Sequence, residues 1–172
     1  MESKRLRIAI VGPGRSGKDT AAEWLGMNTT LRYSMSTSQF ASQFVFDYAN
    51  RTDYPVIFST PEVCFDQRII HRELWAEAID EYNRWDKTRL YKECLKVQDL
   101  LTGIRRSGEL RACIDADLFD LIVWIERDVQ EDKTLTIKAK DCDISILNTT
   151  TRRDLFEKLI KFSKALGILK CS

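Results

Sequence analysis

A glycine-rich segment near the N-terminus constrains the fold of this chain more than any other feature. Residues 12–20 have the sequence Gly-Pro-Gly-Arg-Ser-Gly-Lys-Asp-Thr, and they follow a short, β-branched apolar run at residues 6–11. That run is typical of a strand, and residues 18–25 are typical of a helix. A strand that turns through glycines directly into a helix favours an α/β fold.

The same alternation continues along the 172 residues, which fit one domain. Further strands are predicted at residues 30–35, 97–104, 118–125 and 141–147, and helices at residues 36–48, 67–82, 87–95, 107–114 and 152–166. Asp66 is the expected cap of the long helix at residues 67–82. This pattern predicts a three-layer α/β/α arrangement with a parallel sheet. Residues 36–96 are expected to form a largely helical region. The charged residues 126–141 are either a solvated connection or a short lid.

The glycine-rich segment matches the pattern Gly-x-x-x-x-Gly-Lys of phosphate-binding loops. Glycines let successive amide groups turn inward, and these amides bind phosphate oxygens together with the helix N-terminus. Lys18 would place its charge on the β- and γ-phosphates of a nucleotide. The alternative is a glycine-rich turn with a surface lysine. The predicted phosphate contacts are Gly12, Gly14, Ser16, Gly17, Lys18 and Thr20.

Two charged residues distinguish this loop from the common pattern. Asp19 follows Lys18, where a hydroxyl normally meets magnesium, and its carboxylate could hold the ion directly or through water. Arg15 lies inside the loop, where a guanidinium could bridge phosphates or simply face solvent. The order Arg-Ser-Gly-Lys-Asp-Thr, residues 15–20, resembles the loop of bacteriophage deoxynucleoside monophosphate kinases, and the loop of animal phosphomevalonate kinase is similar.

The resemblance implies a P-loop fold of the nucleoside monophosphate kinase type, with Mg-ATP as phosphoryl donor and a deoxynucleoside monophosphate as acceptor. The helical region at residues 36–96 is expected to bind that acceptor. In that family a central strand ends in an Asp, an apolar residue and an Arg, with a Glu nearby. Arg105 and Glu109 match this pattern, but Gly103 stands where the Asp is expected. Asn148 falls near the family's nucleotide-base loop, where a base contact and a turn role are both open.

Phosphoryl transfer requires positive charge around two anions and around the group that moves between them. Two arginines lie four residues apart on the predicted helix at 67–82 and would share a face. Two more follow the central strand, at the edge where ligands bind in α/β sheets, and another begins the candidate lid. Any of them could instead form ordinary surface ion pairs. The candidate acceptor-binding residues are Arg68, Arg72, Arg105 and Arg106, and the candidate catalytic residues are Arg15, Lys18, Arg105 and Arg127.

Composition narrows the function further. The net charge of +1 argues against a dedicated nucleic-acid partner, and five scattered cysteines with a single histidine argue against a zinc site or a disulfide framework. No apolar run approaches the ~20 residues of a membrane span, and the apolar run after the N-terminal basic residues is too short for a signal peptide. We therefore expect a cytoplasmic protein, in the host cytoplasm if a phage encodes it, and a homodimer stays open.

The leading hypothesis is a kinase that uses ATP and magnesium to convert a deoxynucleoside monophosphate to the diphosphate. The alternatives are a kinase of another small phosphorylated metabolite and a nucleotide-binding module without turnover. Gly103 keeps the last alternative open.

Overall fold

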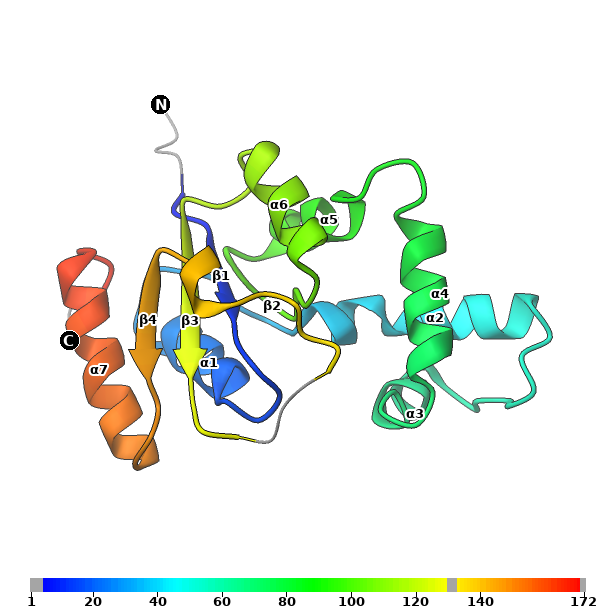
Figure 1. The fold of residues 1–172 in the computed structure, drawn as a ribbon, viewed down its shortest axis with the longest axis horizontal. Helices are drawn as coiled ribbons and strands as arrows, with labels where there is room; N and C mark the ends of the chain where they lie inside the picture. The colour runs from blue at the N-terminus through cyan, green and yellow to red at the C-terminus, as the bar shows by residue number, and fades with distance from the viewer. Residues whose placement is uncertain (1–4, 130–132, 171–172) are drawn as a thin grey trace.

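The computed structural model describes residues 5–129 and 133–170, and a parallel sheet forms its centre (Figure 1). The strands are β1 (Ile8–Val11), β2 (Leu100–Thr102), β3 (Leu121–Glu126) and β4 (Ile144–Leu147). They lie in the order β2-β1-β3-β4, and each neighbouring pair is parallel. The carboxyl ends of these strands therefore meet at one edge, which confirms the predicted α/β fold with a parallel sheet.

Helices cover both faces of this sheet because the side chains of each strand alternate between them. The helices on the two faces are α1 (Lys18–Asn28), α2 (Thr37–Arg51), α5 (Arg89–Val97), α6 (Ser107–Asp115) and α7 (Arg152–Ala165). Ile8 and Ile10 of β1 join the apolar cluster under α1 and α7, whereas Ala9 and Val11 join the cluster under α2, α5 and α6. Within the described residues, no helix has the length and apolar character needed to cross a membrane.

Helices α3 (Pro61–Asp66) and α4 (Arg72–Tyr82) lie away from the sheet and pack on α2 (Figure 1). The prediction of one long helix after Asp66 is wrong, because α3 ends at that residue. Residues 67–71 form a turn in which the amides of Ile70 and His71 both donate to the carbonyl of Gln67, at 2.9 and 3.2 Å. Asp66 therefore caps no helix. The cap of α3 is Thr60, whose hydroxyl accepts from the Val63 amide, and α4 begins after His71, which makes no side-chain cap hydrogen bond.

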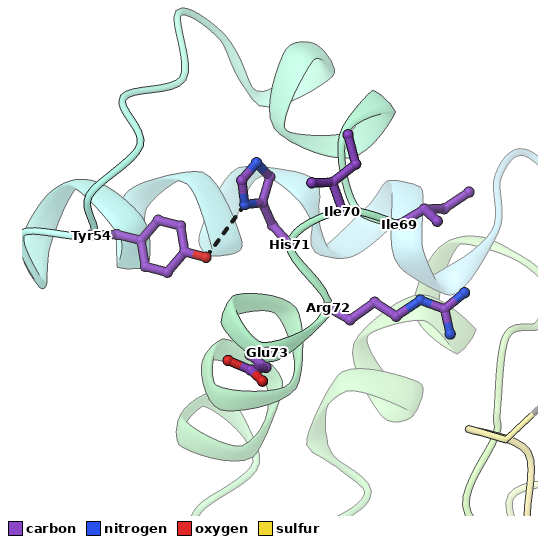
Figure 2. A pocket seen from close by; sticks show the side chains of 6 residues that line it. All are labelled: Tyr54, Ile69, Ile70, His71, Arg72 and Glu73. Carbon is purple, nitrogen blue, oxygen red and sulfur yellow. Dashed lines mark hydrogen bonds between the residues drawn. The ribbon is translucent and has the colours of Figure 1, made fainter.

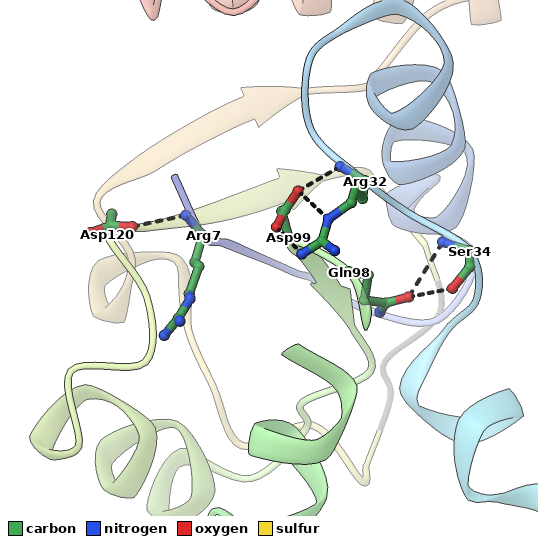
Figure 3. Close-up of polar contacts among 6 residues, drawn as sticks. All are labelled: Arg7, Arg32, Ser34, Gln98, Asp99 and Asp120. Atoms are coloured by element: carbon green, nitrogen blue, oxygen red, sulfur yellow. Dashed lines mark hydrogen bonds and ion pairs between the residues drawn. The ribbon is translucent and has the colours of Figure 1, made fainter. Parts of the chain in front are cut away.

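The predicted strand at residues 30–35 is also wrong, although its backbone does run beside β2. The carbonyl of Arg32 accepts from the amides of Asp99 and Leu100, at 2.9 and 3.2 Å. The Arg32 amide, however, donates to the carboxylate of Asp99 at 2.9 Å rather than to a backbone carbonyl (Figure 3). A side chain thus takes the place of a strand partner, and the segment stays irregular.

A short 3-10 helix, η1 (Ala139–Asp141), precedes β4. Residues 133–138 of the candidate lid lie against the start of α6. There the Thr136 amide donates to the Arg105 carbonyl at 2.9 Å, and the Ser107 amide donates to the Thr136 hydroxyl at 2.8 Å. Residues 130–132 of the candidate lid lie outside the described residues.

Candidate functional site

The glycine-rich loop, residues 12–17, connects β1 to α1 at the carboxyl edge of the sheet. Three of its residues have positive φ, namely Gly12 at 154°, Arg15 at 64° and Gly17 at 94°. A Cβ on Gly12 would lie 2.6 Å from the Ile125 carbonyl oxygen, so the loop backbone passes directly against β3. Left-handed residues in a turn point successive amides into one concavity, which is an anion-binding arrangement.

Arg15 holds its left-handed backbone without the freedom of a glycine. Such a conformation costs a non-glycine residue on the order of 1 kcal/mol, and strained residues of this kind cluster at ligand sites. The Arg15 side chain itself is exposed. Its guanidinium is therefore accessible to a ligand that approaches the loop.

Two other side chains of this unit are buried. Lys18 is only 8% exposed, and its Nζ donates to the Pro13 carbonyl at 3.1 Å, so its ammonium group lies across the loop. Ser16 is fully buried, and its hydroxyl has no hydrogen-bond partner within the described residues. An unpaired buried hydroxyl costs about 1–3 kcal/mol. A phosphate oxygen in the loop would supply the missing partner.

Asn148 follows β4, which is separated from β1 by β3 in the sheet, and its side chain supports the loop. Its Nδ2 donates to the Ser16 carbonyl at 2.7 Å, and its backbone amide donates to the Glu126 carbonyl at 2.7 Å. A Cβ on Gly17 would lie 2.4 Å from that Nδ2, so the two residues are in close contact. The amide nitrogen of Asn148 thus serves the loop backbone, while its contact with a nucleotide base stays a prediction.

A pocket of about 510 Å³ opens beside α1. Asp19 and Glu23, one helical turn apart on α1, both line it. Arg68 brings positive charge to the same pocket. Its guanidinium lies 3.9 Å from the centre of the Phe65 ring and donates to the Phe65 carbonyl at 2.9 Å, so it is held in place. Other residues of the lining are Tyr33, Ser34, Met35, Ser36 and Gln39.

Tyr33 is a residue of this pocket that the sequence did not single out. Its hydroxyl lies 3.2 Å from the hydroxyl of Thr102, at the end of β2. Burial raises the pKa of Tyr33 to about 12, with smaller contributions from the carboxylates of Asp19 and Glu23, although the hydrogen bond with Thr102 opposes this rise. The phenol therefore stays neutral and can both donate and accept. The Ser36–Gln39 capping box is a signal in the sequence that could have pointed to this wall of the pocket. It fixes the start of α2, and the residues just before α2, including Tyr33, line the pocket.

The structure separates Arg68 from Arg72, so the prediction that they share a helical face is wrong. Arg68 lies in the turn after α3, and Arg72 is the first residue of α4. Arg72 lines a different pocket of about 310 Å³ with His71 and Tyr54 (Figure 2). The His71 Nδ1 lies 3.3 Å from the Tyr54 hydroxyl, while the Arg72 side chain extends away from that pair.

The other arginines predicted as site residues lie at or near the carboxyl edge of the sheet. Arg105 follows β2, and its Nη1 donates to the Thr134 hydroxyl of the candidate lid at 2.9 Å. Arg106 forms an exposed ion pair with Asp80 of α4 at 2.9 Å. Arg127 follows β3 and is exposed. Arg105 and Arg127 are thus near the loop's edge of the sheet, whereas Arg106 is directed to the helical region.

The departure at Gly103 has a clear steric reason. Gly103 has a φ of 103°, and a Cβ there would lie 3.3 Å from the Thr37 Cβ at the start of α2. The Thr37 hydroxyl also donates to the Thr102 carbonyl, which fixes α2 against this turn. An aspartate would be strained here and would meet α2 rather than open space.

Asp19 is the residue that would hold magnesium at this site. This carboxylate is exposed in the first turn of α1, immediately after the loop lysine. Within residues 5–129 and 133–170, no three His, Cys, Asp or Glu side chains gather as a metal site. Magnesium commonly takes one or two carboxylates together with phosphate oxygens and water. Asp19 beside a bound nucleotide fits that ligand set.

Neither the family models nor the sequences of curated proteins contain a match to this chain. Among solved structures, it is similar to a sugar kinase from a Janibacter species, determined without ligand, with 14% sequence identity and a TM-score of 0.45. The match covers 93% of this chain and 95% of that protein. A likeness of this size supports no conclusion about family or substrate. What the site can do chemically is therefore inferred from its own residues and their geometry.

Proposed function

We propose that this protein is a P-loop phosphotransferase of the nucleoside monophosphate kinase type, which transfers the γ-phosphate of ATP to a deoxynucleoside monophosphate. The observation that supports it best is the glycine-rich loop. Its positive-φ residues, its unpaired Ser16 hydroxyl and its buried Lys18 together form a cradle for phosphate oxygens.

The loop would bind the donor. Its amides and the Ser16 hydroxyl would contact the phosphates, and Lys18 would exchange its bond to the Pro13 carbonyl for the β- and γ-phosphate oxygens. Magnesium, held by Asp19 and the phosphates, would neutralise charge on those oxygens. Arg15 would add positive charge at the open side of the loop.

The pocket beside α1 would bind the acceptor, because Asp19, which directly follows the loop lysine, is part of its lining. Arg68 lines this pocket and is held there by Phe65, and its guanidinium would bind the acceptor phosphate. Arg105 and Arg127 would stabilise charge on the phosphoryl group during transfer. Arg105 would give up its bond to Thr134 to do so. An acceptor phosphate is already ionised at neutral pH, so the reaction needs no general base.

The test is a coupled kinase assay of ATP against the four deoxynucleoside and four ribonucleoside monophosphates. The Lys18→Ala variant should lose activity by about 100-fold or more, because it lacks the charge that meets the phosphates in the transition state. Lys164→Ala is the matched control, since Lys164 is an exposed lysine in the last turn of α7. Circular dichroism and thermal unfolding should show both variants folded.

Two outcomes would contradict the proposal. Full activity of a folded Lys18→Ala variant would remove the loop from the reaction. Binding of ATP without transfer to any acceptor would favour the nucleotide-binding module, for which the glycine at position 103 is the structural argument.

A further inference from the structure

Gln98 and Asp99 form a rigid junction between α5 and β2. Gln98 is 1% exposed and Asp99 is 3% exposed. The Gln98 amide donates to the Cys94 carbonyl at 3.2 Å and closes the end of α5. The Asp99 carbonyl accepts from the Ile8 amide at 3.0 Å, which ties the junction to β1. Both side chains therefore project from fixed backbone.

The Gln98 side chain uses this fixed position to hold the irregular segment beside β2. Its Oε1 accepts from the Ser34 amide at 3.3 Å and from the Ser34 hydroxyl at 2.9 Å (Figure 3). The same oxygen accepts from the Met35 amide at 3.3 Å. Its Nε2 donates to the Met35 carbonyl at 3.0 Å. The buried side-chain amide of Gln98 thus makes hydrogen bonds to this segment in place of those that a strand ladder would have made.

Ser34 and Met35 are also part of the pocket beside α1. Gln98 itself is absent from the residues that line this pocket, so it can act on a ligand only through them. We propose that Gln98 is a positioning residue of the acceptor pocket, which keeps Ser34 and Met35 in the orientation that binds a deoxynucleoside monophosphate. This role rests on the proposed function, because it assigns the pocket to the acceptor.

Arg32 offers a matched comparison. Its guanidinium donates to Asp99 at 3.0 and 2.8 Å, and these bonds attach the same segment to the same junction. Arg32 is not part of the pocket lining, and its side chain is 44% exposed. The loss of either attachment should lower stability, but only the loss of Gln98 should alter the pocket.

The first experiment compares Gln98→Met with Arg32→Ala in the coupled assay, using dAMP, dCMP, dGMP and dTMP as acceptors. In Gln98→Met, which keeps the length of the side chain, the acceptor KM should rise about tenfold while the KM for ATP stays within about twofold. In Arg32→Ala both KM values should stay within about twofold, although the Tm falls. Equal effects of the two variants on the acceptor KM, or an unchanged acceptor KM in Gln98→Met, would overturn the proposal.

The second measurement is independent of turnover. Amide hydrogen exchange of the wild-type protein should show the Ser34 and Met35 amides protected at least about tenfold, because both donate to Gln98. Gln98→Met should lose this protection and Arg32→Ala should keep it. Unprotected amides in the wild type would overturn the positioning role. A wild type with protected amides and no kinase activity would instead overturn the proposed function.

Discussion

The two walls of the candidate site, the glycine-rich loop and the segment at residues 32–36, obtain their shapes in different ways. The loop is shaped by backbone conformation, with positive φ at Gly12, Arg15 and Gly17. The segment is shaped by side chains, because Gln98 and Asp99 hold it where a strand ladder is missing.

The difference lies in where the determinants stand along the chain. The three positive-φ residues that set the loop backbone lie within the loop itself, although Asn148 also supports the loop from beyond β4. The side chains that hold the other wall come from far along the sequence. Asp99 is 67 residues from its partner Arg32, and Gln98 is 64 residues from its partner Ser34. A local motif can therefore specify the glycine-rich loop, whereas the segment at residues 32–36 depends on the assembled fold.

The largest effect is expected from Gly12→Ala, which tests the backbone side of this comparison. The new Cβ would meet the Ile125 carbonyl at 2.6 Å, at a φ of 154°. Neither the backbone of β3 nor the loop can move freely, so the variant should lose about 3 kcal/mol of unfolding free energy or more. Urea denaturation would measure this loss, and nucleotide binding should fall with it.

Gly108→Ala is the control for that variant. A Cβ there meets no atom within 4 Å, and Gly108 lies in the first turn of α6, where alanine favours a helix. Its stability should be unchanged or slightly higher. If Gly12→Ala were as stable as Gly108→Ala, the backbone of the loop would not be the source of its shape.

Sequence reasoning succeeded where the determinants were local. The glycine spacing, the strand at β1 and the helix at α1 were all predicted in their correct places. The departure at Gly103 was visible as well, but its cause required the structure, because Thr37 of α2 occupies the space beside it.

Sequence reasoning failed where distant side chains or a helix start decided the outcome. A strand is predicted at residues 30–35, but the side chain of Asp99 accepts from the Arg32 amide that a ladder would use. One helix is predicted at residues 67–82, yet Ile70 lies in a turn and is 78% exposed. The position of Arg68 in the pocket, and of Arg72 outside it, followed from that turn.

A smaller effect is expected from Asn148→Ala, which sharpens the comparison because Asn148 is a distant side chain that supports the loop. Loss of its 2.7 Å hydrogen bond leaves the Ser16 carbonyl without that donor and should cost about 1–3 kcal/mol. If Asn148 acts through the loop, the KM values for ATP and GTP should rise by the same factor. A rise confined to ATP would show that the side chain contacts the base, and the loop would then need no such support.

The smallest effect is expected from Asp99→Asn, which tests the side-chain wall through pH. Burial would raise the pKa of Asp99, but the hydrogen bonds from the Arg32 side chain and amide outweigh it and hold the pKa below its usual value. A carboxyl group with a lowered pKa in the folded state contributes stability above its unfolded pKa of about 3.9, and this contribution is lost as the pH falls through the folded pKa.

The wild type should therefore be more stable than Asp99→Asn by about 1 kcal/mol at pH 7, a modest value because Arg32 is 44% exposed and solvent screens the pair. Denaturation curves at several pH values should show this difference shrink below about pH 4. A difference that stayed constant down to pH 3 would assign the stability to the shape of the side chain rather than to its charge. In that case the wall at residues 32–36 would depend on packing, as the loop depends on its backbone, and the contrast between the two walls would rest on Gln98 alone.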